Sequence, residues 1–352
     1  MGQVGHRATV RFPHHRRVEV GDDTAVGEAR RIANRLASDL GADPVGVTRA
    51  ELVATELATN LLRHADPGGW LLLRAARPSR VEILAVDRGP GIPDVATALA
   101  GHSPAPKGLG CGLASARRAS CLLDVYSRAG SGTVVLALVD VADAEASADP
   151  RRCAGVSVGL FEACGDGWSV IELDDGRLAV AVVDGVGHGV AASVAADVVL
   201  DVFGEAPTDL ATFSRRANEA ARGTRGAVAT VCVLDSGAER LSCVAVGNVN
   251  GRVFAEATEK GLLTFSGGLG LTARPPSAKI QHPAWAAGAT LVLWTDGLRS
   301  RLDLTGYPGL FEHDPAVVAA VLHRDHARGT DDATVVVAHD GGRPGFGHPD
   351  GP

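Results

Sequence analysis

The chain has 352 residues, of which 45% are hydrophobic and 21% charged, and its formal net charge is −7. At roughly 150 residues per domain, this length and ordinary globular composition predict two folded domains and exclude a wholly disordered chain. The surplus of acidic residues excludes the basic surface that binding to nucleic acid requires. The first residues lack the apolar core of a signal peptide, and no apolar run is long enough to span a membrane, so we expect a cytoplasmic protein with no membrane partner.

Apolar patterning divides the chain into two regions. The pattern is continuous over residues 8–140, is lost in the small, acidic and turn-prone stretch 141–152, and resumes over 153–340. Residues 341–352 are dense in glycine and proline and are predicted to form a disordered tail. We therefore predict one domain on each side of a linker.

The first region combines helical and strand patterns. Apolar spacing predicts helices at 27–41 and 48–65, with Thr48 and Glu51 forming a capping box at the start of the second helix. Short apolar runs predict strands at 70–76, 80–87, 122–127 and 133–139. A helix layer on a mixed or antiparallel sheet follows from this order.

A nucleotide pocket is predicted in the same region. Glu56 and Asn60 lie four residues apart on one helix, so a carboxylate and an amide project from one face. The strand at 80–87 ends in Asp87, which can accept a hydrogen bond from the exocyclic amine of a purine, and the glycines after it let backbone approach a ligand. A glycine-rich stretch at 107–112 precedes another helix, where free amides can bind polyphosphate.

The order and spacing of ELATN, DRGPGIPD, GLGCGL and GSGT resemble the GHKL ATPase/kinase superfamily, and within it the small switch and anti-sigma serine kinases of the RsbT and RsbW type. The resemblance covers residues 8–140. It implies ATP with Mg²⁺ as cofactors, Glu56 as the general base, Asn60 as a Mg²⁺ ligand and Asp87 as the residue that recognises adenine. The other nucleotide-binding residues that it implies are Gly89, Gly91, Lys107, Gly108, Gly110, Gly112 and Thr133.

The second region is richer in strands. Apolar runs predict strands at 154–161, 168–173, 177–184, 226–235, 240–248, 251–257, 289–296 and 333–340. Helices are predicted near 189–203, 208–222 and 314–327. Two stacked sheets with helices outside them would bury these runs, which predicts an α-β-β-α sandwich.

Acidic residues in the second region stand at or beside the ends of apolar runs: Asp166, Asp184, Asp296, and either Asp331 or Asp332. Strand ends can converge at one edge of a sheet, where carboxylates repel one another unless divalent cations lie between them. Hard oxygen ligands suit Mg²⁺ or Mn²⁺. Two such ions about 4 Å apart can activate water for in-line attack on a phosphoester, so the pattern predicts a phosphatase.

The motifs GD, DGVGHG, TDGL and DDAT, in that order, resemble the SpoIIE-like branch of the metal-dependent, 2C-type serine/threonine phosphatases over residues 153–340. The resemblance implies two Mn²⁺ or Mg²⁺ ions, with Asp184 central to catalysis. The ligands that it implies are Asp166, Asp184, the carbonyl of Gly185, Asp296 and Asp331. Asp331 is chosen over Asp332 by analogy, and the choice between Mn²⁺ and Mg²⁺ stays open.

Together these patterns predict a two-domain α+β signalling protein, in which a GHKL-type kinase-like domain precedes a serine/threonine phosphatase domain. The resemblance implies a phosphorylatable STAS-domain regulatory protein as substrate, and a sigma factor or downstream switch protein as a further partner. Two alternatives for the first domain stay open. It can bind ATP only to sequester a partner, or it can sense the nucleotide and control the phosphatase.

Overall fold

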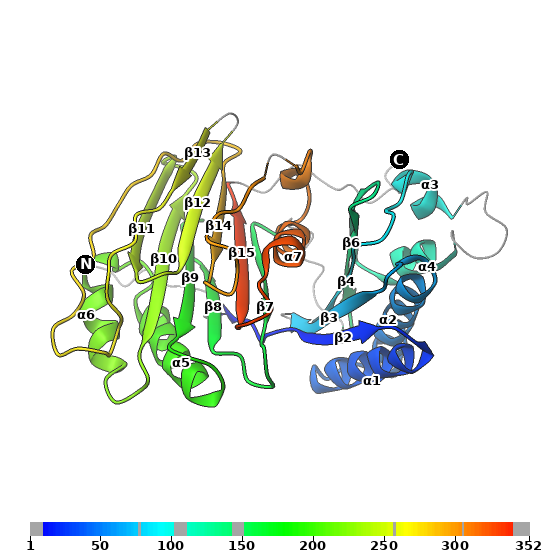
Figure 1. The fold of residues 1–352 in the computed structure, drawn as a ribbon, viewed down its shortest axis with the longest axis horizontal. Coiled ribbons are helices and arrows are strands. Elements are labelled where there is room, and N and C mark those ends of the chain that lie inside the picture. The colour runs from blue at the N-terminus through cyan, green and yellow to red at the C-terminus, as the bar shows by residue number, and fades with distance from the viewer. Residues whose placement is uncertain are drawn as a thin grey trace. The chain divides into compact units, whose positions relative to one another are not determined.

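The computed structural model describes residues 10–76, 79–101, 111–142, 151–255, 258–304 and 306–340. These residues form two compact units. The sandwich unit contains the described residues of Met1–His14, Asp149–Gly306 and Asp325–Pro352, and the single-sheet unit contains those of His15–Ala148 and Tyr307–Arg324. Both units combine helices with antiparallel sheets, which confirms the predicted α+β class (Figure 1).

The single-sheet unit is built on an antiparallel sheet of order β2-β3-β4-β6-β5. Side chains that alternate along the strands, such as Leu71 and Leu73, pack into one core with residues of the helices, as expected of a sheet with a covered face. This confirms the predicted helix layer. The elements are β2 (Arg16–Val20), α1 (Asp23–Asp39), α2 (Pro44–His64), β3 (Gly69–Ala76), β4 (Arg80–Asp87), α3 (Val95–Ala100), α4 (Cys111–Ala119), β5 (Leu122–Arg128), β6 (Gly132–Asp140), η1 (Leu310–Glu312) and α7 (Pro315–His326).

Helix α2 begins earlier than the sequence predicted. Asp43 caps it by accepting a 2.6 Å hydrogen bond from the backbone amide of Gly46, and Pro44 occupies the first turn. The predicted capping box of Thr48 and Glu51 is wrong, because both residues lie inside the helix and the Thr48 hydroxyl donates to the carbonyl of Pro44. An aspartate cap followed by proline favours the earlier start. Among the helices of the described residues, none has the length and apolar composition needed to cross a lipid bilayer.

The sandwich unit stacks two antiparallel sheets, of orders β1-β8-β9-β10-β11 and β13-β12-β14-β15-β7. Trp168, Val182 and Leu293 belong to the core that both sheets share, whereas Phe203 and Phe213 pack helices against the first sheet. The elements are β1 (Val10–Arg11), β7 (Cys153–Val158), β8 (Asp166–Glu172), β9 (Leu178–Gly185), α5 (Val190–Glu205), α6 (Leu210–Ala220), β10 (Ala227–Asp235), β11 (Arg240–Val246), β12 (Asn250–Ala255), β13 (Thr258–Gly261), β14 (Thr290–Trp294) and β15 (Ala333–His339).

Two segments group differently from the predicted boundaries at 8–140 and 153–340. Strand β1 pairs with β8, and Phe12 stacks on Trp168 with ring centroids 4.2 Å apart, so this segment joins the sandwich unit. The segment Tyr307–Arg324, with η1 and most of α7, joins the single-sheet unit. The apolar residues 316–322 are all buried, and a helix that is apolar on every side carries no pattern to indicate which sheet it covers.

The predicted linker begins inside the fold. Val141 is buried, and its amide donates a 2.9 Å hydrogen bond to the carbonyl of Ser79. Residues 143–150 of the predicted linker and the predicted tail at 341–352 lie outside the described residues. The proposed disorder of the tail therefore stays a prediction.

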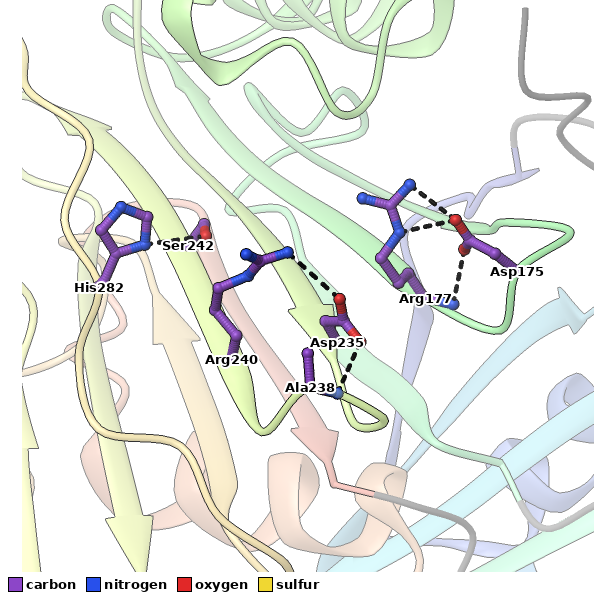
Figure 2. Close-up of polar contacts among 7 residues, drawn as sticks. All are labelled: Asp175, Arg177, Asp235, Ala238, Arg240, Ser242 and His282. Atoms are coloured by element: carbon purple, nitrogen blue, oxygen red, sulfur yellow. Dashed lines mark hydrogen bonds and ion pairs between the residues drawn. The ribbon is translucent and has the colours of Figure 1, made fainter. Parts of the chain in front are cut away.

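Two turns close one end of the first sheet of the sandwich (Figure 2). Asp175 accepts hydrogen bonds from the backbone amide and the guanidinium of Arg177 between β8 and β9. Asp235 accepts from the amide of Ala238 and pairs with Arg240 between β10 and β11. Aspartate side chains commonly stabilise such turns by bonding backbone two or three residues on. Ion pairs this exposed contribute little stability, which makes this end of the sheet a suitable place for control substitutions.

Candidate nucleotide pocket and candidate metal centre

A cavity with about 70 Å³ of water-accessible space lies in the single-sheet unit, bounded by α2, the end of β4, the start of β6 and the start of α4. Its wall is largely apolar, with polar groups at a few points, which is the usual character of a site for a small organic ligand. The lining residues are Leu57, Asn60, Leu61, His64, Ala65, Ala85, Asp87, Gly91, Ile92, Leu113, Thr133 and Val135.

Asp87 is held by backbone at the end of β4. Its Oδ1 accepts hydrogen bonds from the amides of Gly89 (2.8 Å) and Thr133 (3.1 Å). Both of these bonds are made by Oδ1. Among the described residues, Oδ2 accepts neither of them, so it is available to a ligand in the cavity. Burial raises the pKa of Asp87, and the two amides and the guanidinium of Arg324 oppose that rise. The carboxylate is thus oriented before a ligand binds.

The segment after Asp87 is fixed to the hairpin of β5 and β6. Gly91 has a φ of +77°, and a Cβ at this position would lie 2.2 Å from the carbonyl oxygen of Arg128, so only glycine fits. The amide of Ile92 donates to the hydroxyl of Ser127 (2.7 Å), which in turn bonds the hydroxyl of Thr133 (2.8 Å). Gly91 and Thr133 therefore shape the cavity, and their predicted contact with a nucleotide stays a prediction.

Glu56 and Asn60 project from one face of α2 toward the first turn of α4, as their spacing predicted. A Cβ built on Gly112 would lie 2.7 Å from Oδ1 of Asn60 and 3.0 Å from Oε2 of Glu56. The glycine therefore lets the backbone of α4 approach both side chains. Within the described part of the chain, the Nδ2 atom of Asn60 is buried and has no hydrogen-bond partner. Buried polar atoms are nearly always paired, so this atom indicates space for a polar ligand.

His64 is a pocket residue that the sequence motifs did not indicate. It follows Asn60 by four residues on α2 and lines the cavity. Burial, assisted by the charge of Arg63, lowers its pKa and favours the neutral ring. The continued spacing of four from Glu56 through Asn60 was the signal that could have found it. Three predicted nucleotide-binding residues lie outside the described residues: Lys107, Gly108 and Gly110.

In the sandwich unit, Asp166 and Asp184 are directly opposite each other on neighbouring strands. Asp166 begins β8, Asp184 lies next to the end of β9, and the two pair across the antiparallel ladder. Each is two residues from a side chain of the core shared by the sheets, Trp168 and Val182, so both face the second sheet. Like charges directly opposite each other destabilise a sheet, and a bound cation or protonation of one carboxyl would relieve the repulsion.

The second sheet brings further acidic side chains to the same end. Thr295, directly after β14, donates a 2.7 Å hydrogen bond to Oδ2 of Asp166, and Asp296 follows it. Asp331 and Asp332 directly precede β15, which pairs with β14. The strand ends therefore converge as the sequence predicted.

Asp331 and Asp332 differ in what their carboxylates already bind. The oxygens of Asp332 accept hydrogen bonds from the amides of Leu160 (2.7 Å) and Gly165 (2.6 Å), and the residue is buried. Asp331 is exposed, and among the described residues its carboxylate accepts a hydrogen bond from the next amide alone. The carboxylate of Asp332 is thus engaged in holding the loop at 160–165, whereas that of Asp331 is accessible to a cation.

Mutual repulsion and burial raise the pKa values of the converging carboxyls. Burial is the larger cause in each case, and it raises the pKa of Asp166 to about 7 and, with the neighbouring charges, that of Asp184 to about 9. The pKa of Asp296 is raised by burial and by Asp331, although Asn248 and Arg328 oppose the rise. Within the described residues, no three His, Cys, Asp or Glu side chains already have the arrangement of a metal site. The donor set is nevertheless entirely oxygen, as Mg²⁺ and Mn²⁺ prefer.

Comparisons with known proteins assign both units. Residues 21–139 match the histidine kinase-like ATPase domain, and residues 174–339 match stage II sporulation protein E (SpoIIE). The serine/threonine-protein kinase RsbT of Bacillus subtilis (strain 168) is 31% identical over 112 residues, which are 31% of this chain and 84% of RsbT. The chain belongs to the RsbT family of kinase-like ATPases. It joins a kinase-like ATPase domain of the RsbT type to a SpoIIE-type, 2C-type phosphatase domain, and the resemblance inferred from the motifs is confirmed.

Relatives of the phosphatase domain are also found. The phosphoserine phosphatase RsbX of Bacillus subtilis (strain 168) is 29% identical over 137 residues, which are 38% of this chain and 67% of RsbX. A crystal structure of RsbX in complex with magnesium is 22% identical, with a TM-score of 0.46, and the match covers 53% of this chain and 94% of that chain. The single-sheet unit is called the ATPase domain below, and the sandwich unit the phosphatase domain.

Proposed function

We propose that this chain is a two-way switch enzyme. Its ATPase domain transfers the γ-phosphate of ATP to a serine or threonine of a regulatory protein, and its phosphatase domain removes phosphate from such a residue with Mn²⁺ or Mg²⁺. The convergence of Asp166, Asp184, Asp296 and Asp331 at one end of two facing sheets carries the phosphatase half of the proposal. The names of the relatives, a serine/threonine-protein kinase and a phosphoserine phosphatase, support serine or threonine chemistry in both halves.

The motif resemblance points to the regulatory protein as a STAS-domain antagonist of an anti-sigma factor. A sigma factor or a downstream switch protein would then be the further partner. Opposed activities in one chain would let the same protein set the phosphorylation state of that antagonist in either direction.

In the kinase half, each polar group of the cavity has a role that its position supports. Oδ2 of Asp87 would accept the hydrogen bond of the adenine amine, and the carbonyl oxygen of Asn60 would bind the Mg²⁺ that accompanies the nucleotide. The carboxylate of Glu56, beside Asn60, accepts the proton of the attacking hydroxyl. Phosphoryl transfer depends mainly on positioning and charge neutralisation, which are the roles proposed for these groups.

In the phosphatase half, the carboxylates of Asp166, Asp184, Asp296 and Asp331, with the carbonyl of Gly185, would hold the two divalent ions. When bound, the ions neutralise phosphate charge and make water a strong nucleophile at neutral pH. Asp332 shapes the site through the two amides that it binds.

The phosphatase half is tested with p-nitrophenyl phosphate and Mn²⁺. Asp184→Asn should reduce hydrolysis at least about 100-fold while ATP binding, measured by calorimetry, stays unchanged, because Asp184 belongs to the metal site only. Arg240→Met, at the far end of the same sheet, is the matched control and should keep full activity (Figure 2). Mn²⁺-dependent turnover at the wild-type rate in Asp184→Asn would refute the assignment.

A second function of the ATPase domain, nucleotide sensing without phosphoryl transfer, is favoured by one observation. The backbone of Asp87 is bonded to Arg324 of α7, a helix that lies late in the chain. ATP binding without phosphorylation of any STAS-domain protein, together with an effect of ATP on the rate of p-nitrophenyl phosphate hydrolysis, would support sensing in place of the kinase activity.

A further inference from the structure

The ATPase domain incorporates a segment from far along the chain. The segment Tyr307–Arg324 lies between stretches of the phosphatase domain in sequence, yet it packs as part of the ATPase domain. The carboxylate of Asp124 on β5 fixes its start, with one oxygen 2.8 Å from Nδ1 of His313 and the other accepting from the amide of Asp314 at 2.8 Å. The helix that follows is buried over residues 316–322. This segment is therefore an integral part of the domain.

The end of the segment contacts the nucleotide pocket. Arg324 is only 3% exposed, and its Nη1 donates a 3.1 Å hydrogen bond to the carbonyl oxygen of Asp87. In return, the guanidinium of Arg88 donates to the carbonyl of Arg324. Two hydrogen bonds thus join the end of α7 to Asp87, the residue proposed to recognise adenine, and to its neighbour Arg88. A buried guanidinium is costly to leave unpaired, so this connection resists breaking.

The chain beyond Arg324 leads to the metal centre. The carbonyl of His326 accepts from the amide of Arg299 (3.0 Å), and the amide of Arg328 donates to the carbonyl of Gly297 (2.8 Å), directly after Asp296. Three residues further on lies Asp331. A displacement of Arg324 can therefore be transmitted, through eight residues or fewer of continuous backbone, to the two segments that contain the predicted metal ligands Asp296 and Asp331.

We propose that Arg324 is the positioning residue for adenine recognition by Asp87, and that α7 thereby couples nucleotide occupancy to the phosphatase metal centre. This inference rests on the proposed function, because it needs both a nucleotide in the cavity and metal-dependent hydrolysis. Arg324 holds the backbone carbonyl of Asp87, while the amides of Gly89 and Thr133 hold its carboxylate. Binding of ATP to that carboxylate therefore favours one position of the Asp87 backbone, and with it one position of the end of α7. The coupling acts through the covalent continuation of α7 and requires no further ligand.

The test uses the full chain and the variant Arg324→Met, which keeps an unbranched side chain and removes the guanidinium. We expect ATP affinity to fall about tenfold, the usual loss for a buried hydrogen bond from a charged donor. The preference for ATP over GTP should fall as well, because a misplaced Asp87 no longer distinguishes the adenine amine. A merely structural role would weaken both nucleotides equally. The rate of p-nitrophenyl phosphate hydrolysis with Mn²⁺ should respond to ATP in the wild type and not in the variant.

Arg49→Met is the matched control. Arg49 also donates to a backbone carbonyl of an aspartate, that of Asp140 at 3.0 Å, but it is exposed and Asp140 ends β6 away from the cavity. It should leave nucleotide affinity, selectivity and coupling unchanged. Arg88→Met removes the other hydrogen bond between α7 and the end of β4, at an exposed residue, and serves as a second test if Arg324→Met does not fold. It should also reduce the preference for ATP over GTP.

The outcomes separate the two proposals. If the wild type binds no ATP, the proposed function of the ATPase domain fails. If the wild type binds ATP and both Arg324→Met and Arg88→Met keep its affinity, its selectivity and its effect on hydrolysis, the proposed function stands and the role of Arg324 is refuted. Partial restoration of ATP selectivity by Arg324→Lys, which can donate one bond to the same carbonyl, would support positioning.

Discussion

Substitution of the adjacent residues Asp331 and Asp332 by asparagine is predicted to have different effects. Asp332→Asn should reduce stability, whereas Asp331→Asn should reduce Mn²⁺ binding and hydrolysis. Asp332 is buried and accepts two backbone hydrogen bonds at 2.7 and 2.6 Å, and an asparagine oxygen can replace only one of these acceptors. Its NH₂ group would then face an amide donor. The loss of one charge-assisted bond is worth about 1.5–3 kcal/mol, and relief of repulsion with the other carboxylates offsets part of it. We expect Asp332→Asn to lower the free energy of unfolding by about 2 kcal/mol.

Asp331 is exposed, and within the described part of the chain its carboxylate bonds the amide of Asp332 alone. Asp331→Asn should therefore change the free energy of unfolding by less than about 0.5 kcal/mol. It should instead weaken Mn²⁺ binding and abolish hydrolysis. Urea unfolding followed by tryptophan fluorescence in the absence of metal gives the stabilities, and calorimetric titration with Mn²⁺ gives the affinities. Equal stabilities of the two variants would refute the reasoning, as would loss of Mn²⁺ binding confined to Asp332→Asn.

Three further predictions concern the ATPase domain. Glu56→Ala should abolish phosphoryl transfer to the regulatory protein without weakening ATP binding, and undiminished transfer followed by intact mass would remove Glu56 from its role as base. Gly91→Ala should destabilise the domain by more than about 1 kcal/mol in thermal unfolding, because alanine is strained at a φ of +77° and its Cβ meets the Arg128 carbonyl; an unchanged melting temperature would contradict this. Burial lowers the pKa of His323 to about 3, with the charges of Arg17, His15 and Arg88 assisting, so protonation favours the unfolded chain below its ordinary pKa of 6.5. Stability should therefore fall by up to about 2 kcal/mol between pH 6.5 and 5, and His323→Leu should flatten this dependence in urea unfolding; parallel pH profiles would exclude His323 as the cause.

Much of the candidate metal centre could be predicted from sequence because its residues stand at strand ends. An aspartate at the end of an apolar run, such as Asp184, is placed by the strand itself, and an antiparallel sheet puts that end beside the start of the neighbouring strand, where Asp166 lies. The choice between Asp331 and Asp332 could not be made that way. It depends on which carboxylate meets the amides of Leu160 and Gly165, about 170 residues earlier in the chain, and local pattern contains no such information.

The features of the ATPase domain that the sequence did not predict also depend on contacts between residues distant in the chain or on competing caps. The face shared by Glu56 and Asn60 followed from helical spacing, but the start of their helix did not, since Asp43 and Pro44 cap it more effectively than Thr48. The sequence could not predict which domain α7 joins, because a helix that is apolar on all sides can pack against either sheet. Arg324 could not be recognised as a neighbour of Asp87, since only the folded chain brings residues 237 positions apart together.

The central claim is that one chain both adds and removes phosphate on the same regulatory protein. It is tested most directly by following the intact mass of a STAS-domain protein that co-purifies with the chain, first with ATP and Mg²⁺, then after removal of ATP and addition of Mn²⁺. The account predicts the gain of one phosphate followed by its loss. Loss from a phosphorylated sample without any preceding gain would contradict the kinase half, and no change in either step would contradict the account as a whole.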